Sequence, residues 1–225
     1  GYTTIGIAKT DEEMRVHLAT LPDGGQNAFG TIWTAGDIMY NDLNGDGKID
    51  SGANTTDDPG DMSIIGNNSP RFAFGLDLGA DWKGFDIRAF FQGIMKRDFW
   101  QGSYFFWGAS GSGMWWSTGM QEHIDYFRAD SNHPLGQNID SYYPRPLFRG
   151  QNQQTQTRYL QNAAYIRLKN LQLGYTLPQE LTRKFNCNKF RVFISGENLW
   201  TGTRMAKMFD PETVEGGYGG NLYPM

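Results

Sequence analysis

An acidic loop carries the residue types and the spacing best suited to chemistry in this chain. Oxygen-bearing side chains fall at loop positions 1, 3, 5 and 9, a main-chain carbonyl falls at position 7, and a glycine falls at position 6. This spacing is typical of the calcium loops of EF-hand proteins, in which several hard oxygens surround one hard cation. It predicts a structural calcium ion with these ligands: Asp42, Asn44, Asp46, Lys48 through its carbonyl, and Asp50.

Position 12 of the same loop departs from the pattern. An acid that binds calcium through two oxygens belongs there, but Ala53 occupies the position. The site is complete only if a later acid folds back, and the candidates are Asp57, Asp58 and Asp61. The alternative is a tight Asp- and Asn-rich turn without metal, because these side chains readily bond to their own backbone.

A second group of candidate residues is aromatic and lies within residues 97–160, a long stretch without strand periodicity. A loop of this length usually signals function or disorder. Its rings could stack on sugars or pack against a partner protein; the alternative is that they pack on one another and order the loop. Asn and Gln side chains in 151–156 would also suit a polar ligand. The candidate contact residues are Trp100, Tyr104, Phe106, Trp107, Trp115 and Trp116.

The sequence groups no residues for catalysis. Its histidines, at positions 17, 123 and 133, lie in separate segments, and no metalloprotease, serine-hydrolase or phosphate-binding motif occurs. The single cysteine, Cys187, has no neighbouring base and no disulfide partner within the chain. We therefore expect no enzymatic activity.

Two strands joined by a hairpin turn lie within residues 71–94. Apolar residues alternate with small or polar ones on both sides of a two-residue turn at Lys83-Gly84, which predicts an antiparallel pair. The register places Asp81 opposite Asp86, a like-charge pair that needs water or Arg88 to screen it and that suits a wet channel better than a dry core. The expected apolar pairs are Trp82 with Phe85, Ala80 with Ile87, Leu78 with Ala89, and Leu76 with Phe91.

A second pair of strands is predicted at residues 165–177 and 190–200, joined by a short connection with one or two helical turns. In the first of these strands the apolar face changes side near Asn170. This change predicts either a bulge or the point at which the strand leaves its apolar environment.

Long and short connections alternate between the four strands. Two residues join the first pair, but roughly 65 join the second strand to the third. Short turns on one side and long loops on the other predict an all-β chain that forms part of a large antiparallel transmembrane β-barrel. Four strands cannot close a barrel, because the smallest need about eight. The alternative is a soluble β-sandwich with one buried face.

The expected organisation has five segments. A capping box at Thr10 predicts a short helix from about Asp11 to Leu21. The segments are 1–70, a loop region with this helix and the calcium-type loop; 71–96, a barrel hairpin; 97–162, a long loop; 163–200, a second hairpin with a short connection; and 201–225, a further loop.

Composition and charge argue against nucleic acid as a partner and against a membrane-spanning helix. The formal net charge is -4, and no stripe of Lys and Arg exists to neutralise phosphates, which argues against nucleic acid. No apolar run approaches the roughly 18 residues of a membrane-spanning helix. Aromatic residues make up 15% of the chain and there are 29 glycines, yet the mean hydropathy is -0.56, so the chain is at once aromatic-rich and hydrophilic.

Several motifs resemble the C-terminal part of SusC/RagA-type TonB-dependent outer-membrane transporters, in the same order along nearly the whole chain. They are Thr34-Ala35-Gly36-Asp37-Ile38, the acidic loop with Tyr40 and Asn41 before it, Ile65-Gly66-Asn67, the strand from Phe72 to Trp82, Lys83-Gly84-Phe85-Asp86, Phe91-Gln92-Gly93, Arg158-Tyr159-Leu160-Gln161-Asn162-Ala163, Tyr165 to Leu171, Leu173-Gly174-Tyr175-Thr176-Leu177-Pro178, and Ser195-Gly196-Glu197-Asn198-Leu199.

The resemblance implies a barrel of about 22 strands with a plugged lumen. Such a barrel is energised through TonB and imports oligosaccharide or peptide fragments across the outer membrane of a Gram-negative bacterium. A SusD-like surface lipoprotein would cap the extracellular face. The resemblance also implies that the loops 1–70, 97–162 and 201–225 are extracellular, that the turn within 163–200 is periplasmic, and that a final strand should follow residue 225. The plug, the TonB box and the closing strand are absent from this sequence, so we expect the chain to be part of a longer transporter that supplies them.

Two other classes of function stay open from the residues alone. One is a soluble, calcium-stabilised carbohydrate-binding β-domain, which would fold and bind sugar independently. The other is a surface glycan-degrading enzyme, whose hydrolysis would depend on one acid. The importer instead predicts an apolar band on the even-numbered residues of 72–82 and a requirement for detergent.

Overall fold

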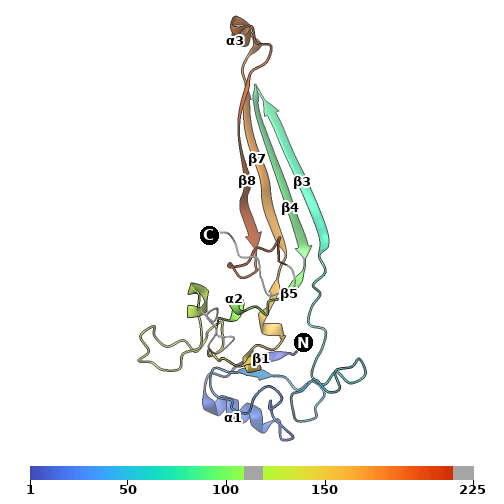
Figure 1. The fold of residues 1–225 in the computed structure, drawn as a ribbon, viewed down its shortest axis with the longest axis vertical. Coiled ribbons are helices and arrows are strands. Elements are labelled where there is room, and N and C mark those ends of the chain that lie inside the picture. The colour runs from blue at the N-terminus through green and yellow to red at the C-terminus, as the bar shows by residue number, and fades with distance from the viewer. Residues whose placement is uncertain (109–118, 215–225) are drawn as a thin grey trace. The chain divides into compact units, whose positions relative to one another are not determined.

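The computed structural model describes residues 1–108 and 119–214, which divide into two compact units (Figure 1). We call residues 1–67 and 100–160 the loop unit, and residues 68–99 and 161–214 the strand unit. Of the expected loop 201–225, residues 215–225 lie outside the described ranges. Among the residues that are described, no helix is both long and apolar enough to cross a membrane.

Four long antiparallel strands lie side by side in the strand unit (Figure 1). Their order in the sheet is β3-β4-β7-β8, and the expected register of the first hairpin is confirmed, from Trp82 opposite Phe85 to Leu76 opposite Phe91. The last strand starts one residue later than expected and runs three residues further. The strands are β3 (Arg71–Trp82), β4 (Phe85–Lys96), β7 (Tyr165–Thr176) and β8 (Arg191–Thr203).

The change of face near Asn170 is a bulge. On β4, Phe90 lies opposite Asn170 and Phe91 lies opposite Leu168, so Lys169 is the extra residue of β7. Residues directly opposite each other share a face of a sheet. The bulge therefore returns Leu168 to the apolar face and turns Arg167 to the polar face.

Within the described residues of the strand unit, nothing covers the apolar face of this sheet. No residue of β3 is buried, and the side chains of Leu78 and Trp82 are 49% and 68% exposed. Within residues 68–99 and 161–214, no second sheet packs on this face. A soluble β-sandwich requires a second sheet packed on this face. The sheet therefore resembles a segment of a barrel wall rather than one layer of a sandwich.

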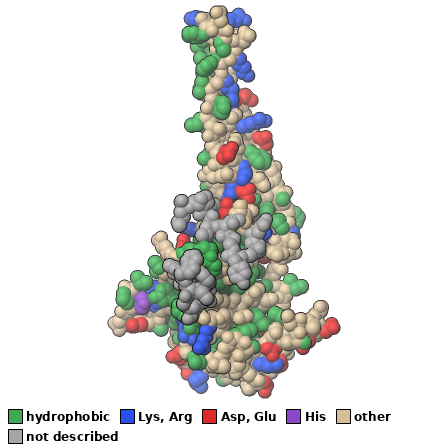
Figure 2. All heavy atoms as spheres, in the orientation of Figure 1, with side chains coloured by type: hydrophobic (Ala, Val, Ile, Leu, Met, Phe, Trp, Pro, Cys, Tyr) green, Lys and Arg blue, Asp and Glu red, His purple; other side chains and the backbone are tan. Residues whose placement is uncertain are grey.

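Charged side chains follow the other face of the sheet. Figure 2 shows Lys, Arg, Asp and Glu side chains succeeding one another along the strand unit on the side turned to the viewer. This pattern agrees with the alternation of the sequence, in which Asp81, Asp86 and Arg88 fall between apolar neighbours. The sheet is thus apolar on one side and charged on the other.

The loop unit is organised around a short two-stranded sheet and one helix. Strand β1 (Thr4–Ile7) pairs with β2 (Ile38–Tyr40), and helix α1 runs over Asp11–Ala19. The predicted N-cap is confirmed, since the Thr10 hydroxyl accepts from the Glu13 N–H. The capping box is confirmed only in this half, because the Glu13 carboxylate accepts from the N–H of Lys9 rather than of Thr10. The helix ends at Ala19 rather than Leu21, close to Pro22, which cannot continue it.

The remaining elements are short. The expectation of an irregular stretch at 97–160 is wrong in part, because the described residues between 97 and 162 contain two short strands and four helical turns. They are β5 (Asp98–Trp100) paired with β6 (Leu160–Asn162), α2 (Tyr104–Trp107), and the 3-10 helices η1 (Gln121–Ile124), η2 (Gly150–Asn152) and η3 (Thr157–Tyr159). The connection between β7 and β8 holds α3 (Gln179–Thr182) and η4 (Arg183–Phe185), as expected.

Candidate functional site

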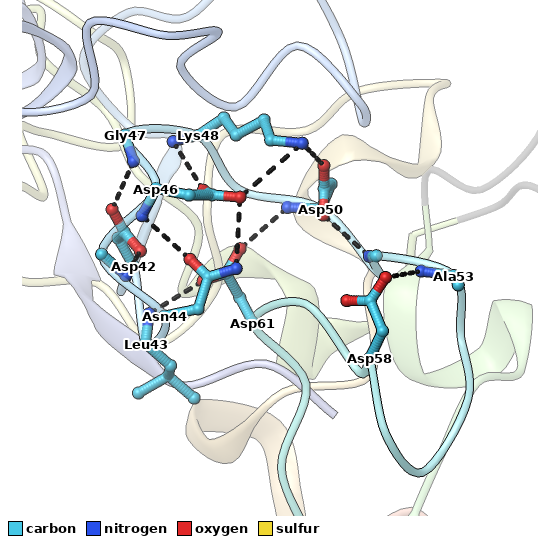
Figure 3. A network of polar contacts seen from close by, with 12 residues as sticks. Asp42, Leu43, Asn44, Asp46, Gly47, Lys48, Asp50, Ala53, Asp58 and Asp61 are labelled. Carbon is cyan, nitrogen blue, oxygen red and sulfur yellow. Dashed lines mark hydrogen bonds and ion pairs between the residues drawn. The ribbon is translucent and has the colours of Figure 1, made fainter.

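The acidic loop is held by bonds from its side chains to its own backbone (Figure 3). The two carboxylate oxygens of Asp42 accept from the N–H groups of Gly45 and Gly47, at 2.6 and 2.9 Å. The Asn44 side-chain oxygen accepts from the Asp46 N–H at 3.0 Å. These contacts fix the tight turn that the sequence predicts, and they are typical of Asx turns.

A cation already lies against two of the predicted calcium ligands. The Lys48 ammonium is 2.6 Å from an Asp50 carboxylate oxygen and 3.6 Å from an Asp46 oxygen. Its hydrogen bond to Asp50 raises the pKa of Lys48 and lowers the pKa of Asp50. The position between these two acids therefore favours a positive charge. That charge comes from the side chain of Lys48, the residue whose main-chain carbonyl was predicted to bind calcium.

Asp61 folds back into the loop, as the incomplete calcium pattern requires of a later acid. Its carboxylate is fully buried and accepts from the N–H groups of Leu43 and Asp50, at 2.8 and 2.9 Å. Burial raises the pKa of this carboxyl group. Asp58 instead accepts from the Ala53 N–H at 2.9 Å (Figure 3).

Calcium binding at this loop stays a prediction. Among the residues that the structure describes, no three Asp, Glu, His or Cys side chains are gathered so that they could hold a metal ion. The donor set and the position of the Lys48 ammonium suit a cation, but the loop oxygens are directed to N–H groups. Calcium would have to compete with these bonds.

The candidate aromatic residues pack largely on one another. Phe106 is fully buried, and Trp107 makes an edge contact with Tyr159 at a ring distance of 4.8 Å. Trp100 lies 5.9 Å from Trp107, and Tyr104 is half-buried. Trp115 and Trp116 lie outside the described residues. The packing of Phe106 and Trp107 orders the loop, and contact with a ligand or a partner stays a prediction.

Sequence reasoning missed a buried carboxylate network in the loop unit. Asp37 has no exposed surface; it accepts from the Arg145 guanidinium at 2.7 and 2.8 Å and from the Asn152 amide at 2.8 Å. It also accepts from the Thr34 N–H at 3.0 Å and from the Gln151 amide at 3.3 Å. A buried charge needs such partners. Through these hydrogen bonds, Asp37 connects the segment 34–38 to residues 145–152.

Three amide side chains within residues 151–156 are structural rather than open to a ligand. Gln151, Asn152 and Gln156 are all buried. The Asn152 side-chain oxygen accepts from the Ile38 N–H at 3.0 Å, and the Gln156 oxygen accepts from the Thr4 hydroxyl at 2.8 Å. These three amides therefore hold the loop unit together, whereas Gln153 and Gln154 are partly exposed, and a polar ligand at them stays a prediction.

On the polar face of the sheet, Arg191 neutralises the predicted like-charge pair. Asp81 lies opposite Asp86, as expected. The Arg191 guanidinium donates to both Asp86 oxygens, at 2.9 and 2.5 Å, and a Cβ at Gly174 would collide with both side chains. The sequence suggested water or Arg88 as the screen; Arg88 lies 3.9 Å from Asp77, and the contact from Arg191 was not foreseen.

A second ion cluster ties the segment after β8 to the polar face. Arg167 is buried, and it pairs with both Asp210 and Glu212 while donating to the Thr201 hydroxyl at 2.8 Å. Lys169 also donates to Glu212, at 2.9 Å. The bulge that turns Arg167 to this face therefore also places it where its charge is paired.

The chain matches two receptors from the bacterium Formosa agariphila. It is 32% identical over 185 residues to TonB-dependent receptor P3, in a match that covers 80% of the chain and 16% of the receptor. It is 26% identical over 210 residues to TonB-dependent receptor P26, covering 84% of the chain and 18% of the receptor. The match thus spans less than a fifth of either receptor. No protein-family model matches the chain.

Solved structures agree with these relatives. A structure of the RagAB peptide transporter superposes with a TM-score of 0.50 and 31% identity, covering 73% of this chain and 16% of that one. A structure of the RagAB peptide importer in an open-open state superposes with a TM-score of 0.55 and 26% identity, covering 99% of this chain and 20% of that one. Together with the uncovered antiparallel sheet, these matches show that the chain belongs to the SusC/RagA-type TonB-dependent receptors, of which it is a segment.

Proposed function

We propose that this chain supplies wall strands and extracellular loops to a TonB-dependent importer in the outer membrane of a Gram-negative bacterium. The observation that carries the proposal is the sheet β3-β4-β7-β8, whose apolar face no part of the strand unit covers. Lipid is the environment that such a face suits, and a watery lumen suits the opposite, charged face. The role is transport rather than catalysis.

In this proposal the short turns face the periplasm and the long loops face outward. The turns are Lys83-Gly84 and the connection 177–190, and the loops are 1–70, 97–162 and 201–225. Strands of 12 or 13 residues are long enough to cross a bilayer at a tilt. The buried network around Asp37 would then hold together two loops on the outer surface.

The proposed partners follow from the family. The rest of the transporter would supply the plug and the other barrel strands, TonB would supply energy, and a SusD-like surface lipoprotein would close the outer face. The two structural neighbours are described as RagAB peptide transporters or importers. For this chain we propose the import of oligomeric nutrients, either oligosaccharides or peptides.

Uptake in cells tests the proposal. The full-length transporter, expressed in a strain that lacks it, should import labelled peptides or oligosaccharides only when TonB is present. Leu78→Arg places a charge on the lipid face at a cost of about 2–4 kcal/mol near the membrane centre, so this variant should lose both the folded barrel and uptake.

Gly79→Arg is the matched control for this experiment. Gly79 lies opposite Arg88 on the polar face, where a Cβ would have only ordinary contacts. The control should keep the folded barrel. Uptake that continues without TonB, or equal tolerance of both arginines, would contradict the proposal.

A further inference from the structure

One end of the strand unit is positively charged. We call residues 177–190 and the Lys83-Gly84 turn the basic tip; the two segments are neighbours, because the Thr176 N–H donates to the Gly84 carbonyl at 2.7 Å. Figure 1 shows α3 at this end of the strand unit, and Figure 2 shows Lys and Arg side chains there. The chain as a whole has a formal net charge of -4, but the basic tip holds four cations and one acid: Lys83, Arg183, Lys184, Lys189 and Glu180.

The four cations of the basic tip are exposed and are not paired with acids. Among the described residues, none of them forms an ion pair with an Asp or Glu side chain. The next cation along the chain, Arg191, is instead paired with Asp86 at 2.5 Å. The Lys83 ammonium lies over the Trp82 ring, 4.9 Å from its centre. The charges of the basic tip therefore stay available to an anionic partner.

Large apolar side chains are exposed beside these cations. Phe185 is 80% exposed, and Leu181, four residues before it, is 46% exposed. Trp82 and Phe85, on either side of the Lys83-Gly84 turn, are also exposed. Exposed rings next to Lys and Arg are typical of protein surface at the headgroup level of a bilayer, where the rings contact the acyl boundary and the cations contact phosphate.

Backbone hydrogen bonds hold the connection between β7 and β8 in a compact form. The Leu177 N–H donates to the Phe190 carbonyl at 2.9 Å, and the Cys187 N–H donates to the Thr182 carbonyl at 3.1 Å. Thr182 is buried, and Asn186 ends η4 in the left-handed conformation, with φ 53°. The exposure of the apolar side chains is therefore a property of the folded connection rather than of a frayed loop.

We propose that the basic tip binds the headgroups of anionic phospholipids in the membrane leaflet that faces the periplasm. The proposal rests on the proposed function, which places the short turns at this leaflet. A phospholipid joins a phosphate, which suits the four cations, to acyl chains, which suit Leu181 and Phe185. Free phosphate and an acidic protein segment match the charge of the basic tip but not its exposed apolar side chains.

Quenching by brominated lipids tests this assignment at the basic tip itself. Asn188 is exposed, so Asn188→Cys in a Cys187→Ser background of the full-length transporter can carry a fluorophore. The labelled protein is placed in vesicles that contain phosphatidylglycerol or phosphatidylcholine brominated near the headgroup. We expect the anionic phosphatidylglycerol to give half-quenching at a mole fraction about tenfold lower than phosphatidylcholine. Added salt should reduce this preference, because it screens exposed charges.

Three variants separate the charge of the basic tip from that of the whole transporter. Arg183→Gln should lower the preference for phosphatidylglycerol about fivefold, the contribution of one cation at an anionic surface. Lys96→Gln is the matched control, because it removes the same charge at the other end of β4, where Lys96 lies opposite Arg71. It should leave the preference unchanged. Phe185→Ser should weaken quenching by both lipids, because the connection loses an apolar anchor.

Three results would overturn the assignment. The first is equal quenching by the two lipids, and the second is an equal loss of preference in Arg183→Gln and Lys96→Gln. The third is displacement of phosphatidylglycerol by inorganic phosphate or by polyglutamate at constant ionic strength, since the occupant would then be a free anion or an acidic protein.

A second label, at Ile87→Cys in the same background, separates this inference from the proposed function. Ile87 lies on the apolar face of β4, opposite Ala80. Quenching of the label at 87 by both lipids, without a preference for phosphatidylglycerol at 188, would overturn the lipid assignment alone. No quenching at 87 by either lipid would overturn the proposed wall.

Discussion

Asp61 holds the acidic loop in place through hydrogen bonds to its backbone. Its buried carboxylate accepts from two backbone N–H groups of the loop, those of Leu43 and Asp50. Asp61→Asn keeps the shape of the side chain. However, its side-chain NH2 group would face the backbone N–H of Leu43 or Asp50, which then has no acceptor. An unsatisfied buried group costs about 1–3 kcal/mol, so we expect faster cleavage between residues 42 and 61 in limited proteolysis of the full-length transporter.

Asp58→Asn is the control for this experiment. Asp58 is exposed and accepts only from the loop N–H of Ala53, so its replacement should change the cleavage rate much less. Equal protection of wild type and Asp61→Asn would show that Asp61 does not hold the loop.

Lys48 is the residue with which calcium would compete. We propose that calcium and the Lys48 ammonium share the carboxylates of Asp46 and Asp50, so that Lys48→Met strengthens calcium binding. The measurement is the thermal midpoint of the purified transporter in calcium against EDTA. We expect a larger calcium-induced rise in the variant, by mass action. No rise in either protein would contradict the calcium prediction.

The pH dependence of this ion pair has a defined sign. The hydrogen bond from the Lys48 ammonium lowers the pKa of the Asp50 carboxyl group in the folded loop. The stabilisation is therefore present above the unfolded pKa of about 3.9 and is lost as the pH falls through the lowered folded value. Because both side chains are partly exposed, this stabilisation is small.

At the scale of elements, the bulge in β7 determines which charged side chains lie on the apolar face of the sheet. Deleting Lys169 removes the extra residue, leaves Leu168 on the apolar face and leaves Arg167 on the polar face. Deleting Leu168 instead moves either Arg167 or Lys169 to the apolar face, at about 2–4 kcal/mol near the membrane centre.

We therefore expect the transporter without Lys169 to fold and the transporter without Leu168 to fail. Heat-modifiable migration in gel electrophoresis distinguishes the folded barrel from the unfolded chain. The opposite ranking of the two deletions would show that the bulge is not at Lys169.

The long strands could be predicted from sequence because their signals are local. A two-residue turn fixes the register of β3 and β4, and a period of two assigns their faces. The change of phase near Asn170 is also visible in the sequence, although it fits either a bulge or an exit from the apolar environment. By contrast, β1 and β2 are only four and three residues long, and Ile38–Tyr40 is buried throughout, so no alternation marks it.

The buried network of the loop unit could not be predicted, because its partners are distant in sequence. Asp37 and Arg145 are 108 residues apart, and neither has a local pattern that identifies the other. The same is true of Arg191, which reaches Asp86 across a strand that contains Gly174. Only the fold brings these residues together.

At the scale of the whole molecule, the sheet of the strand unit has one edge strand on each side. Strands β3 and β8 each pair with one neighbour among the described residues. In lipid every backbone N–H and C=O group must be paired, which is why membrane-spanning sheets are closed barrels. We therefore expect strands from the rest of the longer receptor to pair with both edges.

Spin labels at two adjacent residues test the central claim, that the apolar face of this sheet meets lipid and the charged face meets water. Ile87→Cys and Arg88→Cys, each in a Cys187→Ser background of the full-length transporter, place labels on opposite faces of β4 in lipid vesicles. We predict that the label at 87 is relaxed mainly by oxygen, which concentrates in lipid, and the label at 88 mainly by a water-soluble nickel complex. Equal access of the nickel complex to both labels, or the reverse order, would contradict the account.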